Sequence, residues 1–316
     1  MASWEEADVV CAVDWTGLAA VQTLASMYGA KRSPPLVFLC YRVFSASVNI
    51  TTNPDAAATY RMYEASAWSN AQALVVLSQA DQRNLEQLQS SDDPRPPSAC
   101  FLLYPPLRAD MVQMASQAQL LPPARGPRYL TCCVRLSPEK SPDTFLDILS
   151  HLRTSLCSLN IVPLLCGTGT DPAYVSALHH RAQAVCPETM IRSGFMGPSE
   201  MAEVWQQTIL NVHPSQRDAF GMTIAEAAAF GVPTAGSDGG DVGALDFLAQ
   251  GAFLPIKLSA PAKAAAAIRD LLHDPTRLSQ LQRAAQARAL AWTATAHGAE
   301  LLTILQQAAT ASAALD

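Results

Sequence analysis

The chain has 316 residues, of which 49% are hydrophobic and 15% are charged, and its formal net charge at pH 7 is -6. This composition is typical of a folded globular protein, excludes an intrinsically disordered one, and fits about two domains at this length. The acidic balance and the lack of any stretch dense in lysine and arginine argue against nucleic acid as a partner.

Short apolar runs alternate with helix-compatible stretches along the chain, which is typical of parallel βα units with helices on both faces of the sheet. The strands predicted in the first part are residues 8–13, 36–41, 73–77 and 100–103, and the helices are residues 17–28, 58–70 and 81–89. After a proline-rich break, the predicted strands are residues 129–134, 161–166, 190–191, 209–212 and 233–235. The helices predicted there are residues 143–152, 172–185, 199–205 and 222–230, followed by two or three more in the tail from 261 to 315.

We therefore expect an α/β protein with two Rossmann-like doubly wound parallel-sheet domains. The predicted divisions are a first domain at residues 1–120, a linker at 121–127, a second domain at 128–292 and a C-terminal helix at 293–316. Ligands of open α/β sheets bind beyond the carboxyl ends of the strands, so functional residues are expected in the loops that follow the strands.

The N-terminus and the hydropathy predict a cytoplasmic protein. No run of about eighteen uncharged apolar residues occurs, so no transmembrane segment is expected. Glu5 and Glu6 stand where a signal peptide would carry basic residues. Peripheral contact with a membrane surface stays open.

The strongest candidate site follows the strand that ends near Val212. A polar loop carries Asp218, and Gly221 then leads into a helix that Gly231 is expected to end as a left-handed cap. The unpaired backbone N–H groups at the start of this helix predict an anion site, because they and the helix dipole both favour negative charge.

Two acids flank this predicted anion site, Asp218 before the helix and Glu226 about one turn into it. Acids beside an anion site repel a bare phosphate, so their natural partners are hydroxyl groups attached to that phosphate. A nucleotide diphosphate sugar supplies both, with ribose at one end and hexose at the other. The alternative is a capping aspartate and a solvent-facing glutamate.

Two cations, Arg135 and Lys140, lie in the loop after the strand at residues 129–134. They could neutralise a diphosphate leaving group, arginine as a forked donor and lysine as a mobile point charge, although ordinary surface charge is the alternative. Gly239 and Gly240 follow another strand and would let the backbone approach a phosphate closely. No Asp-x-Asp triplet occurs, so no bound metal is expected.

Together these segments resemble the donor-binding domain of the retaining glycosyltransferases of family 4, the glycosyl transferases group 1, which have the two-Rossmann GT-B fold. The likeness covers nearly all of residues 128–292. It is carried by the spacing of Arg135 and Lys140, the strand before Gly167-Thr-Gly169, Gly194-Phe-Met, and the series Pro214-Ser, Phe220-Gly221, Glu226-Ala, Gly231-Val-Pro233 and Gly239-Gly240.

The resemblance implies a role for each candidate residue. Glu226 would accept hydrogen bonds from the ribose hydroxyls, Asp218 would meet a hydroxyl of the transferred sugar, and Arg135 and Lys140 would stabilise the departing diphosphate. The residues that would present backbone N–H groups to the donor are Phe220, Gly221, Met222 and Thr223. The residues that would line the base are Gly194, Phe195 and Met196.

The function implied is transfer of a hexose from a nucleotide diphosphate sugar to a hydroxyl acceptor, with retention of configuration and without a bound metal or other cofactor. A UDP-sugar is the preferred donor and GDP-mannose the next. The acceptor is a glycan, a lipid or a small molecule. Two alternatives stay open: an inert nucleotide-sugar-binding module, and a nucleotide-sugar epimerase, for which His213 is the one histidine near the predicted site.

The sequence departs from the family pattern in three places. Asp218 is one methylene shorter than the usual glutamate, and Val134 and Ser141 stand where the family usually has glycine. The first part resembles the family only from its middle onward, without the glycine-rich loop of the opening strand. Cys40-Tyr41-Arg42 stands where a histidine is usual. The first domain, on the acceptor side, is therefore predicted to be incomplete.

Overall fold

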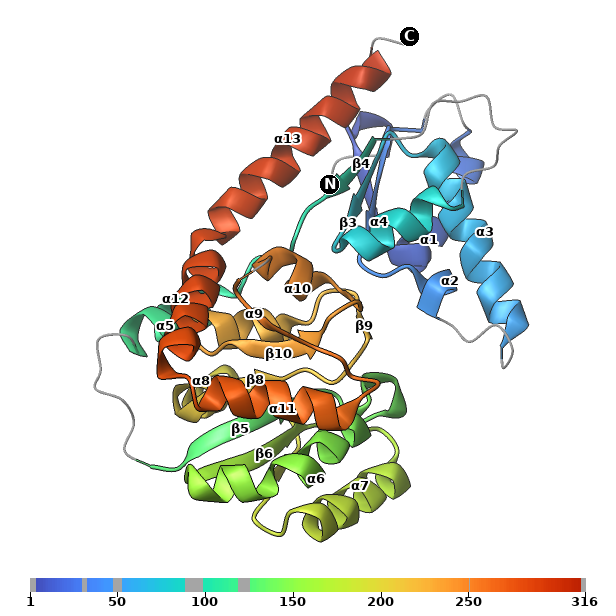
Figure 1. Ribbon diagram of the computed structural model, residues 1–316. Helices are drawn as coiled ribbons and strands as arrows, with labels where there is room; N and C mark the ends of the chain where they lie inside the picture. Colours follow the sequence, from blue (N-terminus) through green and yellow to red (C-terminus); the bar gives the residue numbers. More distant parts are fainter. Residues whose placement is uncertain are drawn as a thin grey trace. The chain divides into compact units, whose positions relative to one another are not determined.

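The computed structural model describes residues 4–29, 33–47, 53–88, 99–118, 126–249 and 251–313. The chain forms two compact units, Met1–Pro105 with Thr295–Asp316, and Pro106–Ala294 (Figure 1). The division falls at Pro105, before the predicted domain boundary at residue 120, and most of the predicted linker at 121–127 lies outside the described residues. The last helix groups with the first unit.

The first unit contains a parallel sheet with the strand order β1-β2-β3-β4. The strands are β1 (Val10–Val13), β2 (Leu36–Cys40), β3 (Ala73–Val76) and β4 (Ala99–Leu102). The helices are η1 (Trp4–Glu6), α1 (Asp14–Tyr28), α2 (Phe44–Ser47), α3 (Pro54–Asn70), α4 (Gln79–Glu86) and α13 (Ala294–Ala313). The four strands predicted in this part are confirmed to within two residues.

The second unit contains a six-stranded sheet, β12-β10-β8-β5-β6-β7, in which every described pair is parallel. Its strands are β5 (Arg128–Cys133), β6 (Ile161–Gly167), β7 (Met190–Ser193), β8 (Thr208–Val212), β10 (Thr234–Ser237) and β12 (Leu254–Ile256). A separate pair is formed by β9 (Arg217–Asp218) and β11 (Asp241–Val242). Its helices are α5 (Ala109–Ala118), η3 (Pro138–Lys140), α6 (Pro142–Ser158), α7 (Pro172–Val185), α8 (Pro198–Gln207), α9 (Met222–Ala229), α10 (Gly243–Leu248), α11 (Pro261–Leu272) and α12 (Pro275–Ala291).

The strand order of the second unit locates its binding edge. Numbered along the chain, the six strands have the spatial order 3-2-1-4-5-6, and the order reverses between the first and fourth strands, β5 and β8. In sheets of this kind the loops leaving two such neighbours diverge and open a crevice beyond the strand ends. The loops after β5 and β8 carry Arg135, Lys140 and Asp218.

Apolar side chains pack helices onto the sheet in two separate clusters, which give the site loops a rigid base. One contains side chains of α6, α7, α11 and α12, with Phe145 and Leu165 fully buried in it. The other contains side chains of α5, α8 and α9, with Trp205 fully buried. Among the described residues, no helix is long and apolar enough to cross a bilayer.

Candidate active site

The loop after β5 is held against the loop after β6 at their carboxyl ends. The amide of Val134 donates to the Cys166 carbonyl at 3.2 Å, and the amide of Leu136 donates to the Thr168 carbonyl at 2.7 Å. Gly167 has φ 148°, and a Cβ there would lie 1.9 Å from the Val134 carbonyl oxygen. Only glycine allows the two loops to approach this closely.

Ser141 links this loop to α6 in a left-handed conformation, with φ 51° and ψ 44°. Its amide donates to the Pro138 carbonyl at 3.1 Å, and its own carbonyl accepts from Thr144 at 3.0 Å. This geometry explains why the family pattern has glycine at the position, because a side chain is strained in that region.

Replacing Ser141 with glycine is therefore expected to raise the free energy of unfolding by about 0.5–1 kcal/mol. Equilibrium urea unfolding of the wild type and of Ser141→Gly measures this difference. Replacing Ser137, which has an ordinary extended φ of −142°, with glycine is the matched control and should destabilise the protein. A loss of stability in Ser141→Gly would contradict the strain.

Lys140 and Asp218 meet at the switch point of the sheet, the place between β5 and β8 where the strand order reverses. The Nζ of Lys140 lies 2.9 Å from Oδ2 of Asp218, and their side chains are only 11% and 21% exposed. Asp218 is held by the β9–β11 pairing, in which it stands opposite Val242. Two residues that the sequence singled out as site candidates, one basic and one acidic, therefore form a partly buried ion pair. Arg135, in the same loop as Lys140, is exposed, and its guanidinium makes no ion pair with a described residue.

His213 lies beside this ion pair, directly after β8. It is 1% exposed, and its Nε2 is 3.7 Å from Oδ2 of Asp218. Burial lowers the pKa of His213 to about 4, while Asp218 acts to raise it and Lys140 to lower it. The histidine is therefore neutral near pH 7 and is a weak base.

Ser215 fixes the loop between His213 and Asp218. Its hydroxyl is buried, donates to the Arg217 carbonyl at 2.7 Å and accepts from the Arg217 amide at 3.2 Å. It also lies 3.5 Å from the Glu139 carbonyl, next to Lys140. The hydroxyl thus holds the turn at Arg217 and lies against the backbone next to Lys140.

Helix α9 begins next to Asp218 with free amides. Gly221, with φ 92°, precedes the helix, and the amides of Gly221, Met222 and Thr223 have no hydrogen-bond acceptor among the described residues. The Thr223 hydroxyl donates to the Cys133 carbonyl at 3.1 Å, which attaches the start of α9 to the end of β5. Gly231, with φ 74°, follows the helix as predicted. Unpaired donors at a helix start favour an anion.

Glu226 lies within α9 and is partly buried. Burial raises its pKa to about 7; Arg108 acts to lower it, Asp110 to raise it, and the Trp205 indole to lower it. Arg108 and Asp110 form an ion pair of 2.6 Å just before and within α5. No motif in the sequence singled out Arg108, which comes near Glu226 only through the packing of α5 on α8 and α9.

The predicted base-lining residues follow β7, one of the two edge strands of the sheet. Gly194 has φ 122°, and its amide donates to the Gly167 carbonyl at 3.3 Å, so this loop joins the loops after β6 and β5. Phe195 is 86% exposed, whereas Met196 packs against the core cluster of α8 and α9. A large exposed aromatic ring on this edge is available to contact a planar ligand.

The two glycines after β10 differ in what they require. A Cβ on Gly240 would lie 2.7 Å from the Gln216 carbonyl oxygen, which is too close. That oxygen also accepts a hydrogen bond of 2.7 Å from the Asp241 amide. Gly240 therefore serves the close packing of the Asp218 loop. A Cβ on Gly239 would meet nothing within 4 Å, so its backbone is open to a neighbour.

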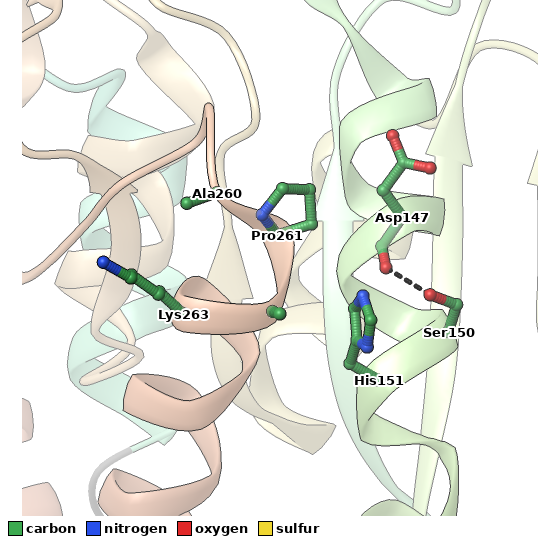
Figure 2. A pocket seen from close by; sticks show the side chains of 7 residues that line it. Asp147, Ser150, His151, Ala260, Pro261 and Lys263 are labelled. Atoms are coloured by element: carbon green, nitrogen blue, oxygen red, sulfur yellow. Dashed lines mark hydrogen bonds between the residues drawn. The ribbon is translucent and has the colours of Figure 1, made fainter.

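A separate pocket of about 370 Å³ lies between α6 and the start of α11. Figure 2 shows Asp147, Ser150 and His151 on one side and Lys263 on the other, with the lysine extending away from α6. The Ser150 hydroxyl donates to the Asp147 carbonyl at 2.6 Å. None of the predicted site residues lines this pocket.

Comparison with known proteins identifies the family. Residues 116–288 match the sequence profile described as "Glycosyl transferases group 1", which is more than half of the chain. The chain belongs to this family. As a group 1 glycosyltransferase sequence it is 28% identical over 247 residues to D-inositol 3-phosphate glycosyltransferase of Kineococcus radiotolerans, covering 72% of this chain and 55% of that protein. It is 29% identical over 188 residues to the protein of the same name in Streptomyces avermitilis, covering 55% and 39%. The chain thus spans about half the length of these curated relatives.

Solved structures confirm the two-domain GT-B fold predicted from the resemblance. Sucrose-phosphate synthase from Thermosynechococcus elongatus superposes with a TM-score of 0.75 at 17% identity, covering 96% of this chain and 74% of that one. Anabaena Alr3699/HepE in complex with UDP and glucose gives 0.70 at 20% identity, covering 98% and 78%. At identities of 17% and 20%, these structures show that the chain shares their fold.

Proposed function

We propose that the chain binds a nucleotide diphosphate sugar and transfers its hexose to a hydroxyl acceptor. The observation that carries the proposal is the Lys140–Asp218 ion pair beside the free amides of α9, at the switch point of the sheet. A cation and helix amides suit a diphosphate, and a carboxylate beside them suits a hydroxyl group. A ligand that carries a diphosphate next to a hydroxyl group would therefore satisfy the cation, the helix amides and the carboxylate together.

Each charged residue of the site binds a different part of the donor. Lys140 and the exposed Arg135 bind the diphosphate, and Asp218 accepts a hydrogen bond from a hydroxyl of the hexose. Glu226 accepts from the ribose hydroxyls. Because Glu226 is partly buried, water competes weakly for its carboxylate. A hydrogen bond from a ribose hydroxyl to this carboxylate is strengthened as a result.

Charge grows on the leaving diphosphate as the bond to the sugar breaks. Cations and amides aimed at those oxygens stabilise the transition state more than the bound donor, and so lower the barrier. We propose transfer with retention of configuration, in which the departing phosphate takes the acceptor proton, and without a metal ion. Lys140 supplies the positive charge at that point.

The relatives support this reading. HepE forms a complex with UDP and glucose, and the curated relatives are named as glycosyltransferases. We therefore propose a UDP-sugar as donor, with GDP-mannose as the next choice, and a hydroxyl acceptor that is a glycan, a lipid or a small molecule. We also propose a cytoplasmic location.

The two alternatives are unequal. An epimerase needs an acid–base group in the site, and His213, with a pKa of about 4 and full burial, is a poor proton acceptor at neutral pH. An inert binding module needs only the pocket, and the Lys140–Asp218 pair would serve it equally. Calorimetry with nucleoside diphosphates beside a donor-hydrolysis assay separates binding from turnover.

A thermal-shift screen of UDP-, GDP- and ADP-sugars tests the proposed donor site. A ligand at about one hundred times its dissociation constant should add about 2.7 kcal/mol to the free energy of unfolding. Glu226→Ala should abolish this gain while leaving the unliganded protein folded, because it removes the ribose acceptor. Glu203→Gln, at an exposed acid on α8, is the matched control. An unchanged shift in Glu226→Ala would remove Glu226 from the site.

A further inference from the structure

His213 is a buried group without an assigned role. Neither of its ring nitrogens has a hydrogen-bond partner among the described residues, although the side chain is 2% exposed. A buried imidazole left unpaired costs stability, so the position of this histidine needs an explanation. The polar group that it faces is the carboxylate of Asp218, at 3.7 Å.

His213 and Lys140 approach the same oxygen atom. Lys140 Nζ lies 2.9 Å from Oδ2 of Asp218 and His213 Nε2 lies 3.7 Å from it, so the histidine is about 0.8 Å beyond an ordinary N–H···O distance. The backbone of Asp218 is fixed by β9–β11 pairing and by Ser215. The same carboxylate oxygen therefore has lysine as its present partner and histidine as its nearest alternative.

The protonation state of His213 suits a donor. Burial lowers its pKa to about 4, so the ring is neutral and carries a single N–H near pH 7. An ionised aspartate accepts hydrogen bonds and donates none, and Oδ2 of Asp218 is the oxygen that faces Nε2. The favourable tautomer therefore has its proton on Nε2.

We propose that His213 is a positioning residue for Asp218: its Nε2–H binds Oδ2 when Lys140 turns to the donor diphosphate. This inference rests on the proposed function. A diphosphate that binds Lys140 competes with Asp218 for its ammonium group, so the hold of Lys140 on the carboxylate is expected to weaken when the donor binds. His213 then keeps Oδ1 aimed at the hexose hydroxyl, so recognition of the sugar depends on His213 and recognition of the nucleotide does not.

Calorimetry with UDP and UDP-glucose tests this on the full chain, or with the corresponding GDP or ADP pair where the stabilisation screen selects that base. His213→Leu is expected to weaken binding of the nucleotide sugar about tenfold and of the nucleoside diphosphate less than twofold, because one hydrogen bond to a charged group is lost. His213→Gln, whose amide nitrogen can replace Nε2, should restore most of the affinity. His273→Leu, at an exposed histidine after α11, is the control.

The outcomes are distinct. A wild type that binds neither ligand refutes the proposed function, and this inference with it. Equal weakening of both ligands in His213→Leu, or no rescue by His213→Gln, overturns the inference and leaves the donor site standing. Nitrogen NMR of the imidazole ring in the wild type needs no variant, so it does not depend on whether a variant folds. A neutral ring protonated on Nε2 supports the inference, and protonation on Nδ1 overturns it.

Discussion

Replacing Lys140 with methionine is expected to slow sugar transfer about one hundred- to one thousandfold, or by about 3–4 kcal/mol in the barrier. Methionine keeps an unbranched side chain, one atom shorter than lysine, and removes its charge. The lysine is 11% exposed at the switch point, so no solvent cation can easily replace it beside the departing diphosphate. Release of nucleoside diphosphate from the donor selected in the screen measures the rate.

Lys263→Met is the matched control for Lys140→Met. This lysine is exposed on α11 and extends away from α6 (Figure 2), and it lines a pocket that contains none of the predicted site residues, so its loss should leave the rate unchanged. Because Lys140→Met also removes the partner of Asp218, the fold of the variant is checked by circular dichroism. A folded Lys140→Met protein with a rate within threefold of the wild type would refute the role of Lys140 at the leaving group.

The pH dependence of the free energy of unfolding should reveal two groups, buried His213 and partly buried Glu226, that act in opposite directions. The pKa of His213 falls from 6.5 to about 4 on folding, so the unfolded state binds more protons in that window and His213 makes stability rise with pH. The pKa of Glu226 rises from 4.5 to about 7, so the folded state binds more protons and Glu226 makes stability fall with pH. Each effect amounts to about 3 kcal/mol across its window, and the two offset each other between about pH 4.5 and 6.5.

Single substitutions separate the two effects. Across that range the free energy of unfolding of Glu226→Gln should rise with pH relative to the wild type, and that of His213→Gln should fall relative to it. Urea unfolding at constant ionic strength measures both, with Glu203→Gln as the control that should follow the wild type. Parallel profiles for all four proteins would show that neither group titrates in an altered way.

The βα order and most of the strand positions could be predicted from local sequence patterns. Periodicity and apolar runs predict strands such as β5 and β6 and helices such as α7, because those patterns follow from which faces of a local segment are buried. The spacing of Arg135, Lys140, Asp218 and Glu226 likewise comes from the chain alone, and with the resemblance it predicted the family to which the chain belongs.

Which of those residues meet depends on how distant segments of the chain pack together. The Lys140–Asp218 pair depends on β5 and β8 becoming neighbours, which no local pattern specifies. The β9 and β11 strands have two residues each and exist only through their mutual hydrogen bonds, so sequence periodicity gave no sign of them. The sequence placed His213 near the predicted site and no more, because its burial and its distance of 3.7 Å from Asp218 are properties of the folded chain.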